Sequence, residues 1–186
     1  MEQIGGIILA GGKSSRMGKD KAFISNQGKM LINYSLELVQ NFCDPVLISA
    51  NSSAYDSFNL PIIKDEFTGY GPIAGIYSSL KHAENNWNFV ISCDTPLVSE
   101  EVVRRLIANL GDYNCVVPTH NGHYEPLVAL YNKSSLIKME LSIQNGIFKM
   151  KVLMDRLKTK FVDVSDLVGN DPDLFRNINS PKDMDY

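Results

Sequence analysis

The sequence contains little cysteine. Three cysteines, Cys43, Cys93 and Cys115, are spread widely through 186 residues. An odd number at wide spacing is not the pattern of a disulfide-rich domain, and it fits a reducing compartment. A chain of this length also buries a core large enough to fold without cross-links. The cysteine pattern therefore argues against a disulfide framework.

Long hydrophobic runs are absent as well. No stretch approaches the roughly 20 apolar residues that a membrane-spanning helix needs. The first three residues carry no basic segment, and the apolar run at 7–10 is too short for the core of a signal peptide. We therefore expect a cytoplasmic protein that does not contact a membrane.

The sequence has no excess of positive charge. Its formal net charge is −3, whereas proteins that bind long nucleic acids need a broad basic surface. The basic residues are nevertheless unevenly placed: four of the eighteen lie within nine residues, at Lys13, Arg16, Lys19 and Lys21. A focused positive site suits a small anion such as a triphosphate. We expect no nucleic-acid partner.

Repeats, low-complexity tracts and linkers are also missing, so we expect a single domain spanning residues 1–186. Short apolar runs alternate with segments of helical spacing. The expected strands lie at 5–10, 46–48, 62–63, 89–91, 115–117, 127–131 and 161–164. The expected helices lie at 30–39, after Gly71-Pro72, and from an N-cap at Ser99 to about Leu110, with weaker helices after Leu136. This alternation predicts an α/β fold with a mostly parallel central sheet and helices on both faces.

Two polar segments directly follow expected strands, at residues 11–21 and 93–96. Ligands of parallel α/β sheets bind at the carboxyl ends of the strands. Both segments are therefore candidate parts of one binding site.

The first of these segments is rich in glycine and basic residues. Paired glycines after a strand let backbone N–H groups approach a ligand, and flanking cations neutralise phosphate oxygens. A solvated turn between a strand and a helix would have a similar composition. A dinucleotide-binding fingerprint is excluded because its glycine spacing is missing. A P-loop is excluded because Ile7 stands where its first glycine should be.

The second segment ends a buried strand with Cys93-Asp94-Thr95-Pro96. Mg²⁺ prefers carboxylate and phosphate oxygens, and Asp94 could supply one such ligand. A turn residue before Pro96 is the competing interpretation, and the sequence pattern alone favours it. We interpret Cys93 as a small buried residue rather than a nucleophile.

His120 and His123 suggest zinc only superficially. No Cys or His pair lies at a supporting distance, and Asn121-Gly122 between them is a turn signal. We expect an exposed hairpin there. No Ser-His-Asp or Cys-His arrangement is recognisable elsewhere.

Nine of the thirteen residues from 9 to 21 match a known signature. The segment resembles the nucleotidyltransferase loop of molybdenum cofactor guanylyltransferases and their cytidylyltransferase relatives. The matching residues are Leu9, Ala10, Gly11, Gly12, Arg16, Met17, Gly18, Asp20 and Lys21. The resemblance implies that Leu9 to Gly12 contact the nucleotide and that Lys21 reaches its phosphates. Arg16 is a physical candidate for neutralising charge as pyrophosphate leaves.

Further segments resemble the same family. Cys93-Asp94-x-Pro96 is similar to its metal-binding motif, which implies Asp94 as the Mg²⁺ ligand. Asn51 and Asp65 are implied nucleotide contacts, and Asn177 and Asn179 are implied acceptor contacts. The segments at 71–76 and 125–131 also match, whereas residues 134–173 match little. The resemblance implies a nucleotide-diphospho-sugar-transferase-like, Rossmann-like fold, with a nucleotide-binding half at about 1–100 and an acceptor-binding half at about 101–186.

The implied reaction is transfer of GMP from GTP to the terminal phosphate of molybdopterin, with Mg²⁺ as cofactor. Arg16, Lys21 and Asp94 are the expected catalytic residues. Two alternatives stay open: a CTP-dependent enzyme acting on the same pterin, and a non-catalytic nucleotide- or cofactor-binding partner of molybdoenzymes. GTP and molybdopterin are the expected partners, molybdoenzymes or their chaperones are further candidate partners, and we expect a monomer.

Overall fold

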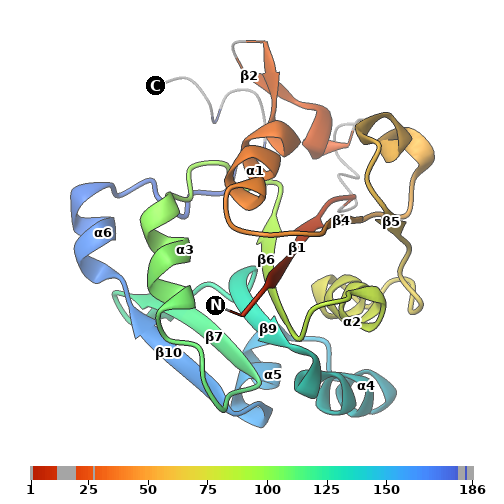
Figure 1. Ribbon diagram of the computed structural model, residues 1–186, viewed down its shortest axis with the longest axis vertical. Helices are drawn as coiled ribbons and strands as arrows, with labels where there is room; N and C mark the ends of the chain where they lie inside the picture. Colours follow the sequence, from red (N-terminus) through yellow and green to blue (C-terminus); the bar gives the residue numbers. More distant parts are fainter. Residues whose placement is uncertain (1, 12–19, 27, 180–182, 184–186) are drawn as a thin grey trace.

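A computed structural model of the chain describes residues 2–11, 20–26, 28–179 and 183. One large sheet forms its centre, and Figure 1 shows the strands side by side. Across the sheet the order is β5 (Ile62–Ile63), β4 (Val46–Ser49), β1 (Ile4–Leu9), β6 (Trp87–Ser92), β9 (Val128–Asn132), β7 (Cys115–His120) and β10 (Thr159–Asp163). A short strand, β8 (His123–Tyr124), pairs with β7.

The sheet is mostly parallel, as the sequence predicted. Strands β5, β4, β1 and β6 pair in parallel, and so do β7 and β10. Strand β9 is antiparallel to both of its neighbours, β6 and β7. Two successive reversals restore the original direction, so β7 and β10 point the same way as β6. The carboxyl ends of six strands therefore lie at one edge of the sheet.

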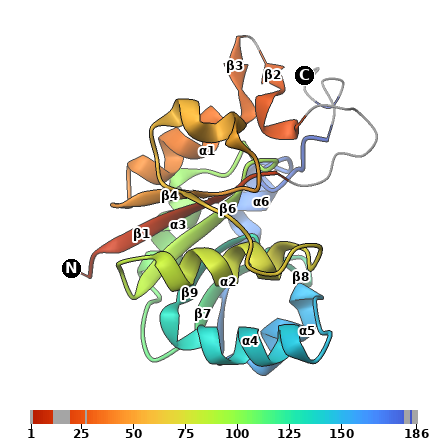
Figure 2. The ribbon, with the colours of Figure 1, turned by 90° about the vertical axis from the view of Figure 1, so that its right-hand side faces the viewer.

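Helices cover both faces of this sheet, which confirms the predicted layers (Figure 2). One face packs against α1 (Leu31–Gln40), α3 (Glu100–Ile107) and α6 (Ser165–Asn170). The other packs against α2 (Pro72–His82), α4 (Leu136–Gln144) and α5 (Met150–Arg156). Shorter elements are the 3-10 helices η1 (Lys21–Phe23), η2 (Ser53–Phe58) and η3 (Lys133–Ser135) and the small hairpin β2 (Ser25–Asn26) and β3 (Lys29–Met30).

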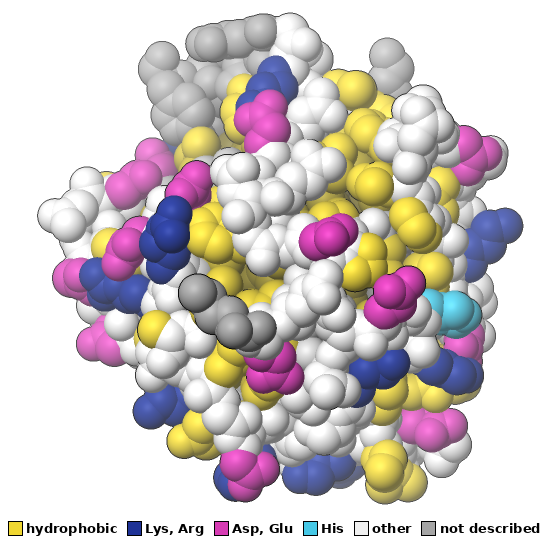
Figure 3. All heavy atoms as spheres, in the orientation of Figure 1, with side chains coloured by type: hydrophobic (Ala, Val, Ile, Leu, Met, Phe, Trp, Pro, Cys, Tyr) yellow, Lys and Arg dark blue, Asp and Glu magenta, His cyan; other side chains and the backbone are white. Residues whose placement is uncertain are grey.

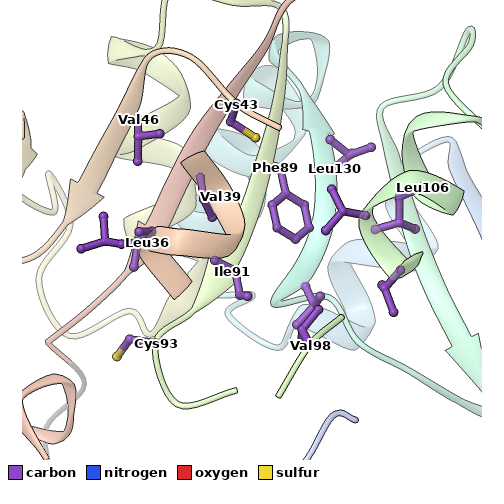
Figure 4. Packing of buried hydrophobic residues seen from close by; sticks show 14 of the residues in the cluster. Leu36, Val39, Cys43, Val46, Phe89, Ile91, Cys93, Val98, Leu106 and Leu130 are labelled. Carbon is purple, nitrogen blue, oxygen red and sulfur yellow. The ribbon is translucent and has the colours of Figure 1, made fainter. Parts of the chain in front are cut away.

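Strand β6 lies near the middle of the sheet, where β1 and β9 pair with its two edges. Figure 4 shows Phe89 between Leu36 and Val39 of α1 on one side and Leu106 of α3 on the other. Phe89 and Ile91 are fully buried. Burial of such a side chain contributes about 2 kcal/mol. The strand that ends at Ser92 is thus held rigidly, and this rigidity fixes the position of Asp94 just beyond it.

Several local expectations are met. Asn121 and Gly122 adopt φ angles of 48° and 77°, as the two central residues of a tight hairpin require. His120 accordingly pairs with His123 across the β7–β8 turn, and its Nε2 contacts Glu125 Oε1 at 3.1 Å. Ser99 occupies the N-cap of α3, but its side chain makes no capping hydrogen bond.

Other boundaries differ from the expectation. Helix α3 ends at Ile107, so Leu110 follows it, and β10 begins at Thr159, two residues earlier than expected. Residues 134–173, which match little of the family pattern, form α4 and α5 on the second face, β10 at the sheet edge and α6 on the first face. The buried α4 residues Met139 and Ile143 share a cluster with α2.

Charged side chains of both signs are interspersed on the face that Figure 3 shows. This agrees with the small net charge of −3. Within the described part of the chain, no helix combines the length and the apolar character needed to cross a membrane.

Candidate functional site

A cleft of about 460 Å³ opens at the carboxyl edge of the sheet. It lies where β1, β4 and β6 end and where α2 begins. Seven residues expected from the sequence to form the site line this one cleft: Leu9, Ala10, Gly11, Lys21, Asn51, Asp65 and Asp94. Gly12 and Arg16 lie outside the described residues. The fold thus brings together seven expected residues that are up to 85 positions apart in the sequence, from Leu9 to Asp94.

The first wall of the cleft is the backbone that leaves β1. The Ala10 N–H donates to the Ser49 carbonyl at 2.9 Å, and the Cys93 N–H donates to the Leu9 carbonyl at 3.0 Å. These bonds hold the exit of β1 between β4 and β6. Gly11 then adopts a φ of 91°, a conformation that disfavours any residue with a side chain. The strand therefore turns sharply into the glycine-rich segment.

The second wall is a reciprocal pair formed by Asn51 and Asp65. The Asn51 side-chain amide donates to Asp65 Oδ2 at 2.9 Å, and the Asp65 backbone N–H donates to Asn51 Oδ1 at 2.9 Å. The pair locks the ends of β4 and β5 together. Both residues line the cleft. Because of their two mutual hydrogen bonds, both side chains are held in place in the absence of a ligand.

Asp94 and Lys21 face each other across the cleft. Lys21 Nζ lies 3.7 Å from Asp94 Oδ2, and both side chains are about one quarter exposed. The other carboxylate oxygen of Asp94 accepts a hydrogen bond from Ser92 Oγ at 2.6 Å. A partly exposed ion pair of this kind gains little stability on its own. A polyphosphate could engage the ammonium group, and a cation could engage the carboxylate.

The C-terminal segment also contacts Asp94 and Lys21. The Ile178 N–H donates to the Asp94 carbonyl at 2.7 Å, and Lys21 Nζ donates to Asn179 Oδ1. Asn179 is therefore brought to the site, as the sequence suggested. Asn177 is exposed and does not line the cleft.

Ser49, Ser92, Gly75 and Asp20 are among the cleft residues that were not chosen as site residues from the sequence, although Asp20 belongs to the matching signature and Gly75 to the matching segment at 71–76. Ser49 and Ser92 are the last residues of β4 and β6. A serine at the end of a mostly apolar strand is the sequence signal that could have identified both residues as cleft residues. Gly75 lies in α2, where a Cβ atom would come within 2.7 Å of Ser49 Oγ and 3.4 Å of Asp65 Oδ1. The absence of a side chain at Gly75 thus lets α2 approach the cleft.

The donor set in the cleft is suited to a hard cation. Among the described residues, no three His, Cys, Asp or Glu side chains gather into a complete metal cluster. A single carboxylate at a strand end fits Mg²⁺, which commonly takes one or two carboxylates together with substrate phosphates. Cys93 is a poor candidate for chemistry, because burial raises the pKa of its thiol well above the ordinary value.

Comparison with known proteins gives a consistent result. Residues 6–159 match the model of the MobA-like NTP transferase domain. The molybdenum cofactor guanylyltransferase of Vibrio cholerae is 34% identical over 183 residues, covering 96% of this chain and 88% of the relative. The probable molybdenum cofactor guanylyltransferase of Carboxydothermus hydrogenoformans is 33% identical over 189 residues, covering 100% and 95%.

Solved structures agree with these sequence matches. Molybdopterin-guanine dinucleotide biosynthesis protein A from Archaeoglobus fulgidus superposes with a TM-score of 0.80 at 29% identity, covering 97% of this chain and 95% of that one. The 4-diphosphocytidyl-2C-methyl-D-erythritol synthase of Anaerococcus prevotii has a TM-score of 0.75 at 15% identity, covering 98% and 93%. The second likeness, at 15% identity, shows that the fold is shared with this synthase.

Proposed function

The chain belongs to the MobA-like NTP transferase family, and from this premise we propose that it transfers GMP from GTP to the terminal phosphate of molybdopterin. The products are pyrophosphate and the guanine dinucleotide form of the cofactor. The names of the relatives described above support the choice of GTP and of the pterin. The observation that carries the proposal is the cleft in which Lys21 and Asp94 face each other at 3.7 Å beside the glycine-rich wall.

The reaction needs one displacement at phosphorus. An oxygen of the acceptor phosphate attacks the α-phosphorus of GTP, and the bond to the β-phosphate oxygen breaks as pyrophosphate leaves. Because the acceptor is already an anionic phosphate, no strong general base is required. The protein contributes by positioning the two substrates and by neutralising charge.

Each wall of the cleft has a role in this proposal. The backbone of Leu9 to Gly11, continued by Gly12, contacts the nucleotide, and the Asn51–Asp65 pair offers fixed polar groups to the nucleoside. Lys21 binds the phosphates. Arg16, which was chosen from the sequence alone, binds them as well. The side chain of Asp94 would hold Mg²⁺, which when bound neutralises phosphate charge and holds the triphosphate in place.

The acceptor approaches from the other half of the chain. In this proposal residues 1–100 bind the nucleotide and residues 101–186 bind molybdopterin, with Asn177 and Asn179 as contacts. Asn179 is already hydrogen-bonded to Lys21, so an acceptor bound there would meet the phosphate-binding residues directly. We propose that the protein acts as a monomer and delivers its product to molybdoenzymes or their chaperones.

Thermal unfolding with GTP, CTP, UTP and ATP, each with and without Mg²⁺, tests the nucleotide assignment. A ligand that binds only the folded state raises stability by RT ln(1 + [L]/Kd), which is about 2.7 kcal/mol at 100 times Kd. We expect selective stabilisation by GTP that increases with Mg²⁺. A preference for CTP would instead identify a cytidylyltransferase. No response to any triphosphate, even with molybdopterin present, would refute nucleotidyl transfer and favour a carrier role.

The close approach of α2 gives a second test. Gly75→Ala places a methyl group 2.7 Å from Ser49 Oγ and 3.4 Å from Asp65 Oδ1. Because Ser49 is buried, the cleft wall must shift to make room for the methyl group. We expect the Kd for GTP to rise about tenfold, which corresponds to a loss of about 1.4 kcal/mol of binding free energy. Titration calorimetry would measure it.

Gly169→Ala is the matched control, because Gly169 also lies in a helix but has open space around its Cβ position. Alanine has a higher helix propensity than glycine, so this effect of the substitution is the same in both variants. Unchanged GTP affinity in the Gly75 variant would show that the cleft wall does not depend on this contact.

A further inference from the structure

Tyr55 is a buried polar residue that the proposed reaction does not use. It lies in η2, four residues after Asn51, and its side chain is fully buried. Its ring packs against Phe23, with ring centroids 5.0 Å apart, and against Phe58 at 6.3 Å. A hydroxyl group at this depth requires a partner, since an unpaired buried hydroxyl costs about 1–3 kcal/mol.

The partner is a carboxylate at the edge of the cleft. The Tyr55 hydroxyl donates to Asp20 Oδ2 at 2.6 Å. The other oxygen, Asp20 Oδ1, accepts from the Ala22 backbone N–H at 3.2 Å and so caps η1, the 3-10 helix that begins at Lys21. One carboxylate therefore joins the buried phenol to the backbone that carries Lys21.

The same phenol lies close to the other end of the glycine-rich segment. Burial and the neighbouring Asp20 both raise the pKa of Tyr55, whereas a hydrogen bond from the Gly11 backbone lowers it. A Cβ atom added at Gly11 would lie 3.8 Å from the backbone of Ala50 and Asn51, which lead into η2. Tyr55 thus contacts residues on both sides of the segment that the sequence assigns to phosphate binding.

The charge of Asp20 explains why a hydroxyl donor is useful here. Asp20 lines the cleft beside Lys21, and a carboxylate without its donor would attract the ammonium group away from a bound phosphate. With Tyr55 and Ala22 occupying both oxygens, Lys21 instead points toward Asp94 and Asn179.

We propose that Tyr55 is a positioning residue, whose hydroxyl holds Asp20 and through it fixes Lys21 for the triphosphate. This inference rests on the proposed function, since it concerns the same cleft. It predicts that the hydroxyl supports nucleotide binding without touching the nucleotide.

Tyr55→Phe removes only the hydroxyl and keeps the ring packing. We expect the KM for GTP to rise about fivefold, the effect of losing one hydrogen bond of about 1 kcal/mol, with the KM for molybdopterin unchanged. Tyr131→Phe is the matched control: Tyr131 is equally buried, and its hydroxyl donates to the Pro126 carbonyl at 2.8 Å. A merely structural effect would lower the stability of both variants and leave the KM for GTP alone.

The route through Lys21 is tested by combining substitutions. In a Lys21→Ala background, Tyr55→Phe should no longer change the Kd for GTP measured by calorimetry. An undiminished effect in that background, or equal GTP affinity of the Tyr55 and Tyr131 variants, would overturn the inference. If Tyr55→Phe does not fold, Asp20→Asn takes its place in the same comparison. Failure of the unaltered protein to bind GTP would instead count against the proposed function itself.

Discussion

Replacing Asp94 by asparagine is expected to lower kcat/KM for nucleotidyl transfer about 1,000-fold, which corresponds to about 4 kcal/mol of lost transition-state stabilisation. Asparagine keeps the size of the side chain and an oxygen for the Ser92 hydroxyl, which now donates to Asp94 Oδ1 at 2.6 Å. The substitution removes the negative charge that would hold Mg²⁺. Activity assays over a range of Mg²⁺ concentrations, together with thermal unfolding, would measure the two effects separately.

Asp163→Asn is the control for this prediction. Asp163 also ends a parallel strand of the sheet and accepts from a serine hydroxyl, that of Ser165 at 2.6 Å. Asp163 does not line the cleft, so its substitution should leave kcat/KM within about twofold, as for a surface change away from the site. If both variants lost activity equally, or neither did, Asp94 would have no special role.

Lys21→Gln is expected to lower kcat/KM about 100-fold, since a donor to developing negative charge contributes about 2.7–4 kcal/mol in comparable sites. Glutamine can still donate a hydrogen bond to Asn179, as Lys21 does now, but it carries no charge. The Kd for GTP should therefore rise, and the remaining affinity should depend less on salt concentration. Calorimetry at two ionic strengths would measure both.

Lys29→Gln serves as the comparison. Lys29 lies eight residues further along and pairs with Glu37 rather than with a cleft residue. Its substitution removes the same charge from the molecule without changing the cleft. A loss of GTP affinity as large as that of Lys21→Gln would mean that general positive charge, and not the position of Lys21, attracts the triphosphate.

Features that depend on short stretches of sequence were predictable. The apolar runs that became β1, β4 and β6 and the turn at Asn121-Gly122 each carry a local signal. The position of Asp94 followed from one further rule, that ligands bind where parallel strands end.

Features that depend on distant pairing were not predictable. Tyr55 and Asp20 are 35 residues apart, and no local pattern in either segment points to the other. The insertion of antiparallel β9 between β6 and β7 depends on which edges the whole chain leaves available. The roles of Gly12 and Arg16 stay predictions from the sequence, because both lie outside the described residues.

The contacts of the C-terminal segment affect the order in which parts of the structure can form during synthesis. Asn179 meets Lys21 across 158 positions, and Ile178 packs against Leu31. Ribosomal synthesis proceeds from the N-terminus at about 5–20 residues per second, so Lys21 and Asp94 emerge well before their C-terminal partners Asn179 and Ile178. The residues that line the cleft all precede residue 128, whereas the contacts of Ile178 with Asp94 and of Asn179 with Lys21 can form only after residue 179 has been made. A nascent chain that stops short of residue 178 would carry the cleft residues without the C-terminal contacts to Asp94 and Lys21.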